Sequence, residues 1–456
     1  MLHNRQLIIP TNFGGNSRKM GSYCELYISK FPIATTKNEV DPFLLSIFQP
    51  EDLIDFERKV GKRFQLLYGR EDEADENERA IQYVNTAKNL KERLDIIGFT
   101  MKRVEEAFEN SKEESLERLK EWLHSPSFND SDSMTNRLSE EIKLLENSSL
   151  ADFLEACKEI IENENGFTLE KDDTQSSKNA IVNYLLEERH GLEKFPYDYD
   201  QRTLLRAVLE ITKSEEKVTY DITELVEAGY CEDDPESIYD EVIANVTYDY
   251  EIGDKFLILT EGSSDIQILK KSLDLLYPHL SGYYSFMDFG VSNASGSAGS
   301  LVASVKSFVG ADIRNKIIAL FDNDTAAESA IRGLSNTKIP DNIKIVQYPS
   351  IKFLEEYPTI GPSGITKMNI NGLAGSIEMY LGTDTLTEKK ELIPVQWKGF
   401  DSTLKKYQGE IVDKATVQKK FEKRIKSCIE NSEKIKEYDW SGIDQILKMI
   451  FELFNK

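Results

Sequence analysis

The amino-acid sequence predicts two folded domains, an α+β, mostly helical N-terminal domain over residues 20–250 and an α/β domain over residues 251–456. Two observations predict this division. Up to residue 250, apolar residues recur at helical spacing within charge-rich segments. After residue 254, short apolar runs alternate with longer amphipathic segments, which is the pattern of strand–helix–strand units. Residues 1–19 lack periodicity and are predicted to form a flexible tail.

The α/β domain is expected to have a four-stranded parallel core, because its predicted elements alternate β–α–β–α–β–α–β and such connections are right-handed crossovers. The predicted strands are 255–260, 283–289, 317–321 and 343–348, and the predicted helices are 266–276, 301–308 and 325–334. A Gly- and Pro-rich segment, 357–375, is predicted to form an exposed loop, and residues 433–456 to form a final amphipathic helix. A helix over 417–429 precedes it, so the domain carries a helical extension.

Acidic residues follow two of the predicted strands directly. Glu261 follows the first strand, and Asp322 and Asp324 follow the third. Because ligands bind at the carboxyl edge of open α/β sheets, we expect these side chains to meet there. Ser263 and Ser264 are predicted to cap the next helix, which places Asp265 near its entry. Oxygen-rich clusters of this kind suit Mg²⁺.

The stretches LTEGSSD (259–265) and ALFDND (319–324) resemble the signatures of the TOPRIM domain. This domain is shared by topoisomerases, bacterial primases, recombination proteins and OLD-family nucleases. The resemblance covers roughly residues 254–350. It implies an endonuclease that hydrolyses phosphodiester bonds of DNA or RNA with Mg²⁺ or Mn²⁺, most simply as two ions. Glu261, Asp322 and Asp324 would hold one ion, and Glu261 would also move a proton.

Two further residues are implied by the resemblance to OLD-like nucleases. Glu378, in GSIEMYLG, would complete a second metal site with Asp265, and Lys414 would stabilise charge on the transferring phosphate. The alternatives are an ordinary surface glutamate and a solvated basic helix face.

Contacts to the nucleic-acid backbone are expected from two segments. The Ser- and Gly-rich loop 292–300 contains Ser297 and precedes a helix whose N-terminus favours anions, although a flexible linker has the same composition. The basic run 397–424 includes Lys405, Lys406 and Lys419, which can follow phosphates.

No GxxxxGK[ST] stretch occurs, so the ATPase of OLD-type nucleases is missing and a separate ATPase or sensor partner is expected. The alternative function is a non-catalytic TOPRIM-like module that senses or binds a ligand within a defence complex.

The N-terminal domain is expected to open with a strand or hairpin from residue 20 and then to be helical. Helices are predicted within 50–55, 57–68, 72–112, 111–124, 136–161, 178–188, 203–211 and 222–228. Asp198 or Asp200 is the expected cap of the helix at 203.

The stretches MGSYCELYI and QRTLLRAVLE…DITELVEAGY are similar to the N-terminal domain that bacterial proteins combine with HEPN or TOPRIM modules. That resemblance implies an effector in anti-phage defence. Arg118 and His124 are also spaced as in HEPN ribonucleases, but six residues place them about 240° apart around a helix. A solvated helix is therefore the preferred interpretation of that pair.

Composition bounds the remaining properties. The net charge is −24, yet residues 251–456 are nearly balanced, with 26 Lys and Arg against 27 Asp and Glu. The acidic N-terminal half would repel phosphate and suits a protein interface, so a homodimer or larger assembly is expected.

The sequence shows neither an apolar run of ~20 residues nor a signal peptide, so no membrane contact is expected. Four dispersed cysteines without a CxxC fit a cytoplasmic protein.

Overall fold

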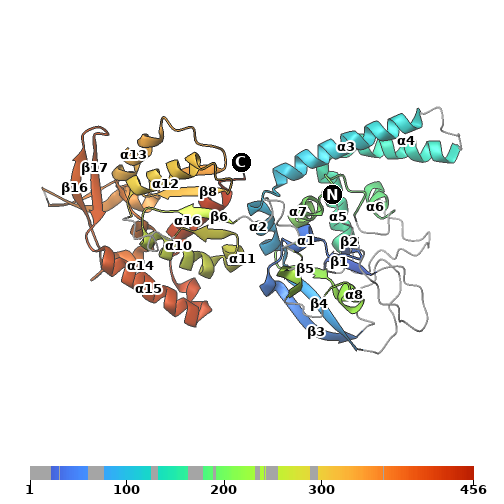
Figure 1. Ribbon diagram of the computed structural model, residues 1–456, viewed down its shortest axis with the longest axis horizontal. Coiled ribbons are helices and arrows are strands. Elements are labelled where there is room, and N and C mark those ends of the chain that lie inside the picture. Colours follow the sequence, from blue (N-terminus) through green and yellow to red (C-terminus); the bar gives the residue numbers. More distant parts are fainter. Residues whose placement is uncertain are drawn as a thin grey trace. The chain divides into compact units, whose positions relative to one another are not determined.

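The computed structural model describes residues 22–29, 31–59, 77–124, 132–162, 178–187, 192–231, 237–240, 242, 255–287, 296–362 and 364–455. The chain forms two compact units (Figure 1). The first contains Met1–Ala87 and Phe108–Ala244, and the second contains Lys88–Ala107 and Asn245–Lys456. The predicted tail lies outside the described residues. No helix in the described part is long and apolar enough to cross a membrane.

The first unit is built on a five-stranded antiparallel sheet in the order β2-β1-β5-β4-β3. Its strands are β1 (Tyr23–Ile28), β2 (Phe31–Lys37), β3 (Leu53–Lys59), β4 (Asn77–Thr86) and β5 (Lys217–Asp221). In β1, half-exposed and buried residues alternate along the whole strand. This period of two is what a sheet requires when only one of its faces packs on a core.

Helices form the rest of the first unit. They are α1 (Pro42–Leu45), η1 (Pro50–Asp52), α3 (Met101–Leu123, entering this unit at Phe108), α4 (Asp132–Asn147), α5 (Leu150–Glu162), α6 (Ala180–Leu185), α7 (Gln201–Ile211) and α8 (Thr223–Glu227). Asp200 caps α7 as predicted, because its side chain accepts the N–H of Arg202 at 3.0 Å. Phe108, Phe153 and Phe195 stack edge to face in the core between helices.

The prediction of a mostly helical N-terminal domain with a small β element is wrong in three segments. Residues 53–59 and 77–86 are strands, and β5 falls in a segment for which no strand was predicted. Ile81 and Val84 stand three residues apart, which is also helical spacing, but β4 pairs with β5 from 130 or more residues further along the chain. Such remote pairing overrides the local pattern.

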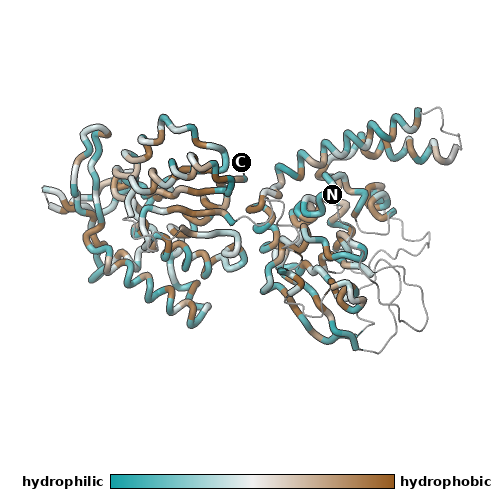
Figure 2. Tube along the Cα trace, in the orientation of Figure 1, coloured by the Kyte–Doolittle hydropathy of each residue, from teal (hydrophilic) through white to brown (hydrophobic). Residues whose placement is uncertain are grey.

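The second unit contains the predicted four-stranded parallel sheet, in the order β10-β8-β6-β7. Its strands are β6 (Phe256–Leu259), β7 (Tyr284–Phe286), β8 (Ile317–Phe321) and β10 (Ile343–Gln347). All five residues of β8 are buried. Figure 2 shows these strands as hydrophobic, as expected for a parallel sheet covered on both faces.

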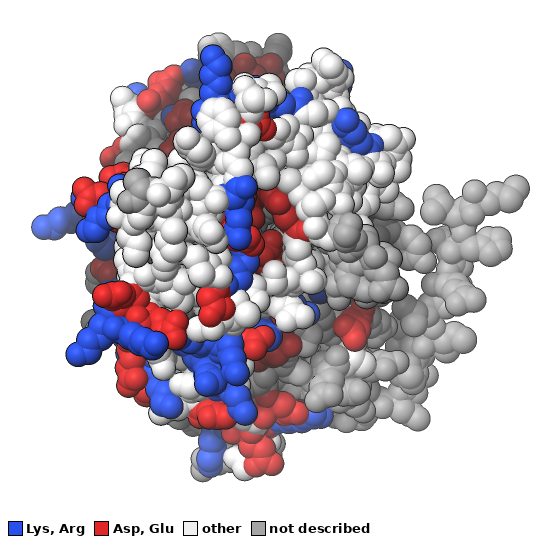
Figure 3. All heavy atoms as spheres, turned by 90° about the vertical axis from the view of Figure 1, so that its left-hand side faces the viewer, with Lys and Arg blue, Asp and Glu red and all other residues white. Residues whose placement is uncertain are grey.

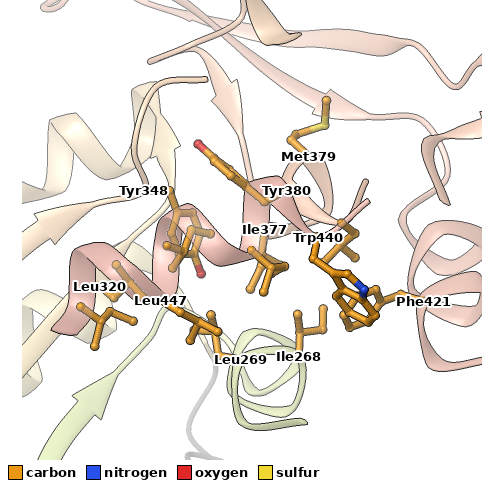
Figure 4. Packing of buried hydrophobic residues seen from close by; sticks show 14 of the residues in the cluster. Ile268, Leu269, Leu320, Tyr348, Ile377, Met379, Tyr380, Phe421, Trp440 and Leu447 are labelled. Carbon is orange, nitrogen blue, oxygen red and sulfur yellow. The ribbon is translucent and has the colours of Figure 1, made fainter. Parts of the chain in front are cut away.

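Helices cover the two faces of this sheet. Alternate residues of β6 and β8, such as Ile258 and Leu320, pack with α10 (Ser263–Leu276) and α16 (Ser441–Glu452). The intervening residues, such as Leu259 and Phe321, pack with α12 (Ala298–Gly310) and α13 (Thr325–Ile331). The predicted α/β core is therefore present. Figure 4 shows the first cluster, in which Leu269 and Leu320 meet side chains of the C-terminal extension.

The C-terminal extension includes a second sheet of four strands, in the order β12-β11-β16-β17. These are β11 (Tyr357–Gly361), β12 (Gly364–Met368), β16 (Val395–Asp401) and β17 (Lys406–Ile411). The predicted exposed loop over 357–375 is therefore a hairpin with a buried inner strand, because Tyr357 and Thr359 are inaccessible to solvent. Gly364, at φ +99°, provides the left-handed conformation at its turn.

The other elements of the second unit are shorter or lie after these strands. They are α11 (Pro278–Ser281), η3 (Arg332–Leu334), η4 (Lys352–Glu356), β9 (Asn323–Asp324) with β13 (Ala374–Gly375), η5 (Ile377–Tyr380), α14 (Thr383–Leu386), β14 (Thr387–Glu388) with β15 (Glu391–Leu392), α15 (Lys414–Glu430) and η6 (Ser432–Glu437). The helix predicted over 433–456 is two pieces, η6 and α16.

Residues 88–107 belong to the second unit although they precede its sheet by about 150 residues. They contain most of α2 (Ala87–Ile96) and the start of α3. Arg93 is 1% exposed, and its Nε donates to the carbonyl oxygen of His279 at 2.8 Å. Ile96 belongs to the same apolar cluster as β6 and α10.

Candidate functional site

The adjacent parallel strands β6 and β8 bring Glu261 and Asp322 together, as predicted. Both residues leave the carboxyl ends of their strands. Glu261 Oε1 accepts the backbone N–H of Asp322 at 2.9 Å, across 61 positions of sequence. The shared edge of the sheet is therefore the centre of the candidate site.

Asp265 lies in the first turn of α10 and is 7% exposed. The predicted serine cap is wrong, since the N-cap is Gly262 and no side chain caps this helix. Burial raises the pKa of Asp265 to about 7, with a further contribution from Glu378. Burial also raises the pKa of Glu261 to about 7, and the charges of Asp324 and Asp265 add to this shift.

The carboxyl group of Asp322 lies among the other acidic side chains of the site. Burial raises its pKa well above the ordinary value, and the charges of Asp265 and Glu261 raise it further. Among the residues that the structure describes, none forms a hydrogen bond with its buried Oδ1. A buried acceptor left in this state is costly in a folded protein.

Asp324 is held by two hydrogen bonds. Its Oδ1 accepts the N–H of Ala327 at 2.8 Å, so Asp324 is the N-cap of α13. Its Oδ2 accepts Nε2 of Gln408 at 2.7 Å, and the same glutamine accepts the N–H of Ala326. The carboxylate therefore has a fixed orientation, 8% exposed.

Glu378 lies in the short helix η5, as predicted, and is 2% exposed, so it is not an ordinary surface glutamate. Its Oε2 accepts the hydroxyl of Ser376 at 2.6 Å, and its Oε1 accepts Nε2 of Gln418 at 2.7 Å. Its charge contributes to the raised pKa of Asp265. The structure therefore brings Glu378 close to the other carboxylates.

Lys414 is the first residue of α15 and is half-buried beside the acidic group. Burial lowers the pKa of its ammonium group, but the charges of Glu378, Asp322 and Glu410 outweigh burial and the net shift is upward. Its Nζ lies 3.4 Å from Glu410. The ammonium group therefore stays charged next to the carboxylates.

The predicted substrate-binding residues have different surroundings. Ser297 caps α12 by accepting the N–H of Ser300 at 3.1 Å. Gly296 before it packs on the site, since a Cβ there would lie 2.4 Å from the carbonyl oxygen of Glu261. Lys406 is 2.6 Å from Glu328, whereas Lys405, at φ +56°, and Lys419 are exposed.

Figure 3 shows acidic side chains in a hollow of this face, with basic side chains at its border. Further basic side chains gather lower in the same view. The acidic hollow therefore has positive charge at its border.

Within the described ranges, no three His, Cys, Asp or Glu side chains lie close enough together to hold a metal ion as they stand. Sequence reasoning also missed Gln408 and Gln418, which orient two of the carboxylates. Neither glutamine belongs to a recognisable sequence motif, so nothing in the sequence distinguishes Gln408 and Gln418 from the other glutamines.

Arg118 and His124 do not form a site with each other in the described part of α3. Arg118 Nε donates weakly to the carbonyl oxygen of Glu114, and His124 Nδ1 contacts that of Lys120 at 2.6 Å. Both contacts are local to their own helix, in agreement with the solvated-helix interpretation.

Comparison with known proteins gives one family. Neither the curated proteins nor the solved structures contain a match to this chain. The family model that matches is described as HEPN/Toprim N-terminal domain 1, and the match covers residues 20–245. It supports an N-terminal domain of this kind and an association with Toprim. Residues 20–245 are thus similar to the HEPN/Toprim N-terminal domain 1 family, and an α/β unit with a four-stranded parallel sheet follows them in the chain.

Proposed function

We propose that the second unit is a metal-dependent TOPRIM nuclease that hydrolyses phosphodiester bonds of DNA or RNA. One observation supports this proposal most directly. Among the described residues, the buried Oδ1 of Asp322 has no hydrogen-bond partner, and four other carboxylates and one lysine lie near this side chain. Protein stability alone does not favour such a group, because like charges oppose each other and burial opposes each of them. Functional sites commonly have this property.

The residues present fit a hard divalent cation. All the candidate donors are carboxylate oxygens, which Mg²⁺ and Mn²⁺ prefer to nitrogen or sulfur. Glu261, Asp322 and Asp324 would hold one ion, and Asp265 and Glu378 would lie near a second. The carboxylates would have to draw together, since no three of the described ones form a ready site. When bound, the ions would activate the attacking water and stabilise the leaving oxygen.

The other steps belong to side chains of this chain. Lys414, positively charged beside Asp322 and Glu378, would stabilise negative charge on the phosphate. Glu261 would exchange a proton, and its pKa of about 7 suits a group that must both accept and release one. Asp324 is kept in orientation by Gln408 and α13, which limits the rearrangement needed during reaction.

Substrate positioning would use the periphery of the site. Lys405, Lys406 and Lys419 would contact phosphates, and Ser297 would present the N-terminus of α12. These contacts orient a backbone without selecting a base sequence, so they are compatible with either DNA or RNA.

The test is cleavage of single- and double-stranded DNA and RNA with Mg²⁺ or Mn²⁺. Glu261→Gln and Asp322→Asn should each reduce cleavage by at least about 100-fold. Asp274→Asn is the matched control, because Asp274 is an exposed aspartate of α10. If no nucleic acid is cut with either ion, or if both variants keep full activity, the nuclease proposal fails and a non-catalytic binding module takes its place.

The biological setting rests on the match of the N-terminal domain. We propose an effector of bacterial anti-phage defence that a separate ATPase or sensor controls. Phage plating efficiency on cells that carry the wild type or Glu261→Gln tests this role. Equal plating with both chains and with an empty control would contradict it.

A further inference from the structure

The β16–β17 hairpin carries an exposed aromatic cluster that the candidate site does not use. It consists of Trp397, Phe400 and Tyr407. The ring centroids of Trp397 and Tyr407 are 5.7 Å apart, and those of Phe400 and Tyr407 are 5.0 Å apart. Phe400 is 55% exposed and Tyr407 is 52% exposed, whereas Trp397 packs partly on the apolar core. One ring therefore anchors the cluster and two face solvent.

The hairpin that carries this cluster also carries lysines. Lys405 is exposed at the turn of the hairpin, next in sequence to Lys406. Lys398 follows Trp397 and is 3.9 Å from Glu410. On β12, every residue is exposed, including Ile365 and Lys367. An exposed face of rings and lysines matches a ligand that has both flat apolar surfaces and negative charge.

The cluster is continuous with the candidate site through the backbone of β17. The carbonyl oxygen of Tyr407 accepts the hydroxyl of Thr325 at 2.7 Å, and Thr325 follows Asp324. The next residue, Gln408, donates directly to Asp324. Figure 1 shows the β16–β17 hairpin at the end of the second unit that faces the viewer in Figure 3. The ring of Tyr407 is therefore one strand position away from a side chain of the candidate site, on the other side of β17.

We propose that Phe400 and Tyr407 stack with unpaired bases of a single-stranded nucleic acid, whose phosphates contact Lys405 and Lys398. This inference rests on the proposed nuclease function and specifies its substrate class. Bases stack on exposed aromatic rings with little sequence preference. A duplex hides the faces of its bases and offers mainly phosphates, which would leave the two exposed rings without partners.

The experiment measures binding of fluorescein-labelled single-stranded DNA, single-stranded RNA and duplex DNA of equal length by anisotropy. Ca²⁺ replaces Mg²⁺ so that binding is measured apart from turnover. Phe400→Ala with Tyr407→Ala should weaken single-strand binding about 5- to 150-fold per stacked base and change duplex binding much less. Phe400→Trp should retain affinity, because it keeps an aromatic face.

Tyr230→Ala is the matched control, since Tyr230 is 53% exposed and lies in the first unit. Equal single-strand affinity of the double alanine variant and the wild type would overturn the inference. So would a change in oligomeric state in light scattering with unchanged affinity, which would assign the face to a second copy of the chain. Binding that depends on the rings without any cleavage would support the inference while contradicting the nuclease proposal.

Discussion

Two carboxyl groups of the candidate site should make the stability of the protein depend on pH. Burial raises the pKa values of Asp265 and Glu261 to about 7, from ordinary values of 3.8 and 4.5. The folded metal-free chain thus binds protons between about pH 4 and pH 7 that the unfolded chain releases. Their contribution to stability is complete below the unfolded pKa and is lost as pH rises through about 7.

We therefore expect the melting temperature of the metal-free protein to fall between pH 5 and pH 8, and to fall less in Asp265→Asn. Over this pH range, the free energy of unfolding should change by on the order of a few kcal/mol more in the wild type than in Asp265→Asn, since one pKa unit corresponds to about 1.4 kcal/mol. Thermal unfolding in EDTA at several pH values measures it. Asp274→Asn, on the exposed side of α10, should behave as the wild type. The same pH dependence in wild type and Asp265→Asn would show that the Asp265 carboxyl is not the source.

Gln418 gives a second residue-scale prediction. It donates to Glu378, which is almost fully buried, and leucine cannot replace that donor. Gln418→Leu should cost about 1–3 kcal/mol of stability because an acceptor loses its partner. On the proposed function, in which Glu378 is a metal ligand, cleavage should also fall about 10- to 100-fold, because Gln418 would orient that ligand. Differential scanning fluorimetry and the cleavage assay measure the two effects.

The matched control for Gln418 is Gln267→Leu, which replaces an exposed glutamine of α10. It should change neither stability nor cleavage appreciably. If Gln418→Leu is destabilised to the expected extent but cleaves at the wild-type rate, Gln418 has a structural role only.

The sequence identifies charged site residues better than neutral ones. Glu261 and Asp322 could be predicted because each ends an apolar run, and parallel strands deliver their carboxyl ends to one edge. Gln408 and Gln418 reach the site through β17 and α15, and their roles depend on tertiary packing. Periodicity does not reveal which of many glutamines such packing selects.

Close backbone packing between two elements supports the position of Glu378. Gly442 of α16 lies against η5, and a Cβ at this position would be 2.5 Å from the carbonyl oxygen of Tyr380 and 2.8 Å from its Cα. Both neighbours are backbone atoms, so Gly442→Ala must displace η5 or α16. We expect a loss of about 1–3 kcal/mol and reduced cleavage, because Tyr380 is two residues from Glu378.

Gly310→Ala is the corresponding control. Gly310 ends α12 and has nothing within 4 Å of an added Cβ, so alanine should leave the stability unchanged or slightly raised. Melting temperatures of the two variants, measured side by side, separate close packing from helix propensity. A Gly442→Ala variant as stable as the wild type would mean that η5 adapts without cost.

Elements with remote partners are those that local patterns failed to predict. The helices α3, α7 and α10 follow from apolar spacing within each segment. In contrast, β3 was predicted as helix because its sequence is rich in charge and its partner β4 lies beyond a long connection. The β11–β12 hairpin was predicted as a loop because its Gly and Pro residues also occur in loops. Its pairing with β16 is a long-range contact.

At the scale of the whole molecule, the chain contributes to its second unit twice. Residues 88–107 provide Arg93 and Ile96, and residues 245–456 provide the sheets. A fragment of residues 245–456 should therefore melt at a lower temperature than the same fragment mixed with a peptide of residues 87–107. Fluorimetry with increasing peptide concentration measures this effect.

A peptide carrying Ile96→Ala provides the comparison, because it removes a side chain that is 3% exposed in the core. It should stabilise the fragment less than the natural peptide does. If the fragment is equally stable with and without either peptide, residues 88–107 contribute nothing to the folding of the second unit.

The contribution of α2 also has an evolutionary consequence. The stretch that matches the N-terminal family, residues 20–245, contains Arg93 and Ile96. Exchange of the downstream module by recombination near residue 245 would leave those two side chains facing a foreign surface. Successful exchanges would need compensating changes on that helix, so α2 should covary among relatives with the type of domain that follows it.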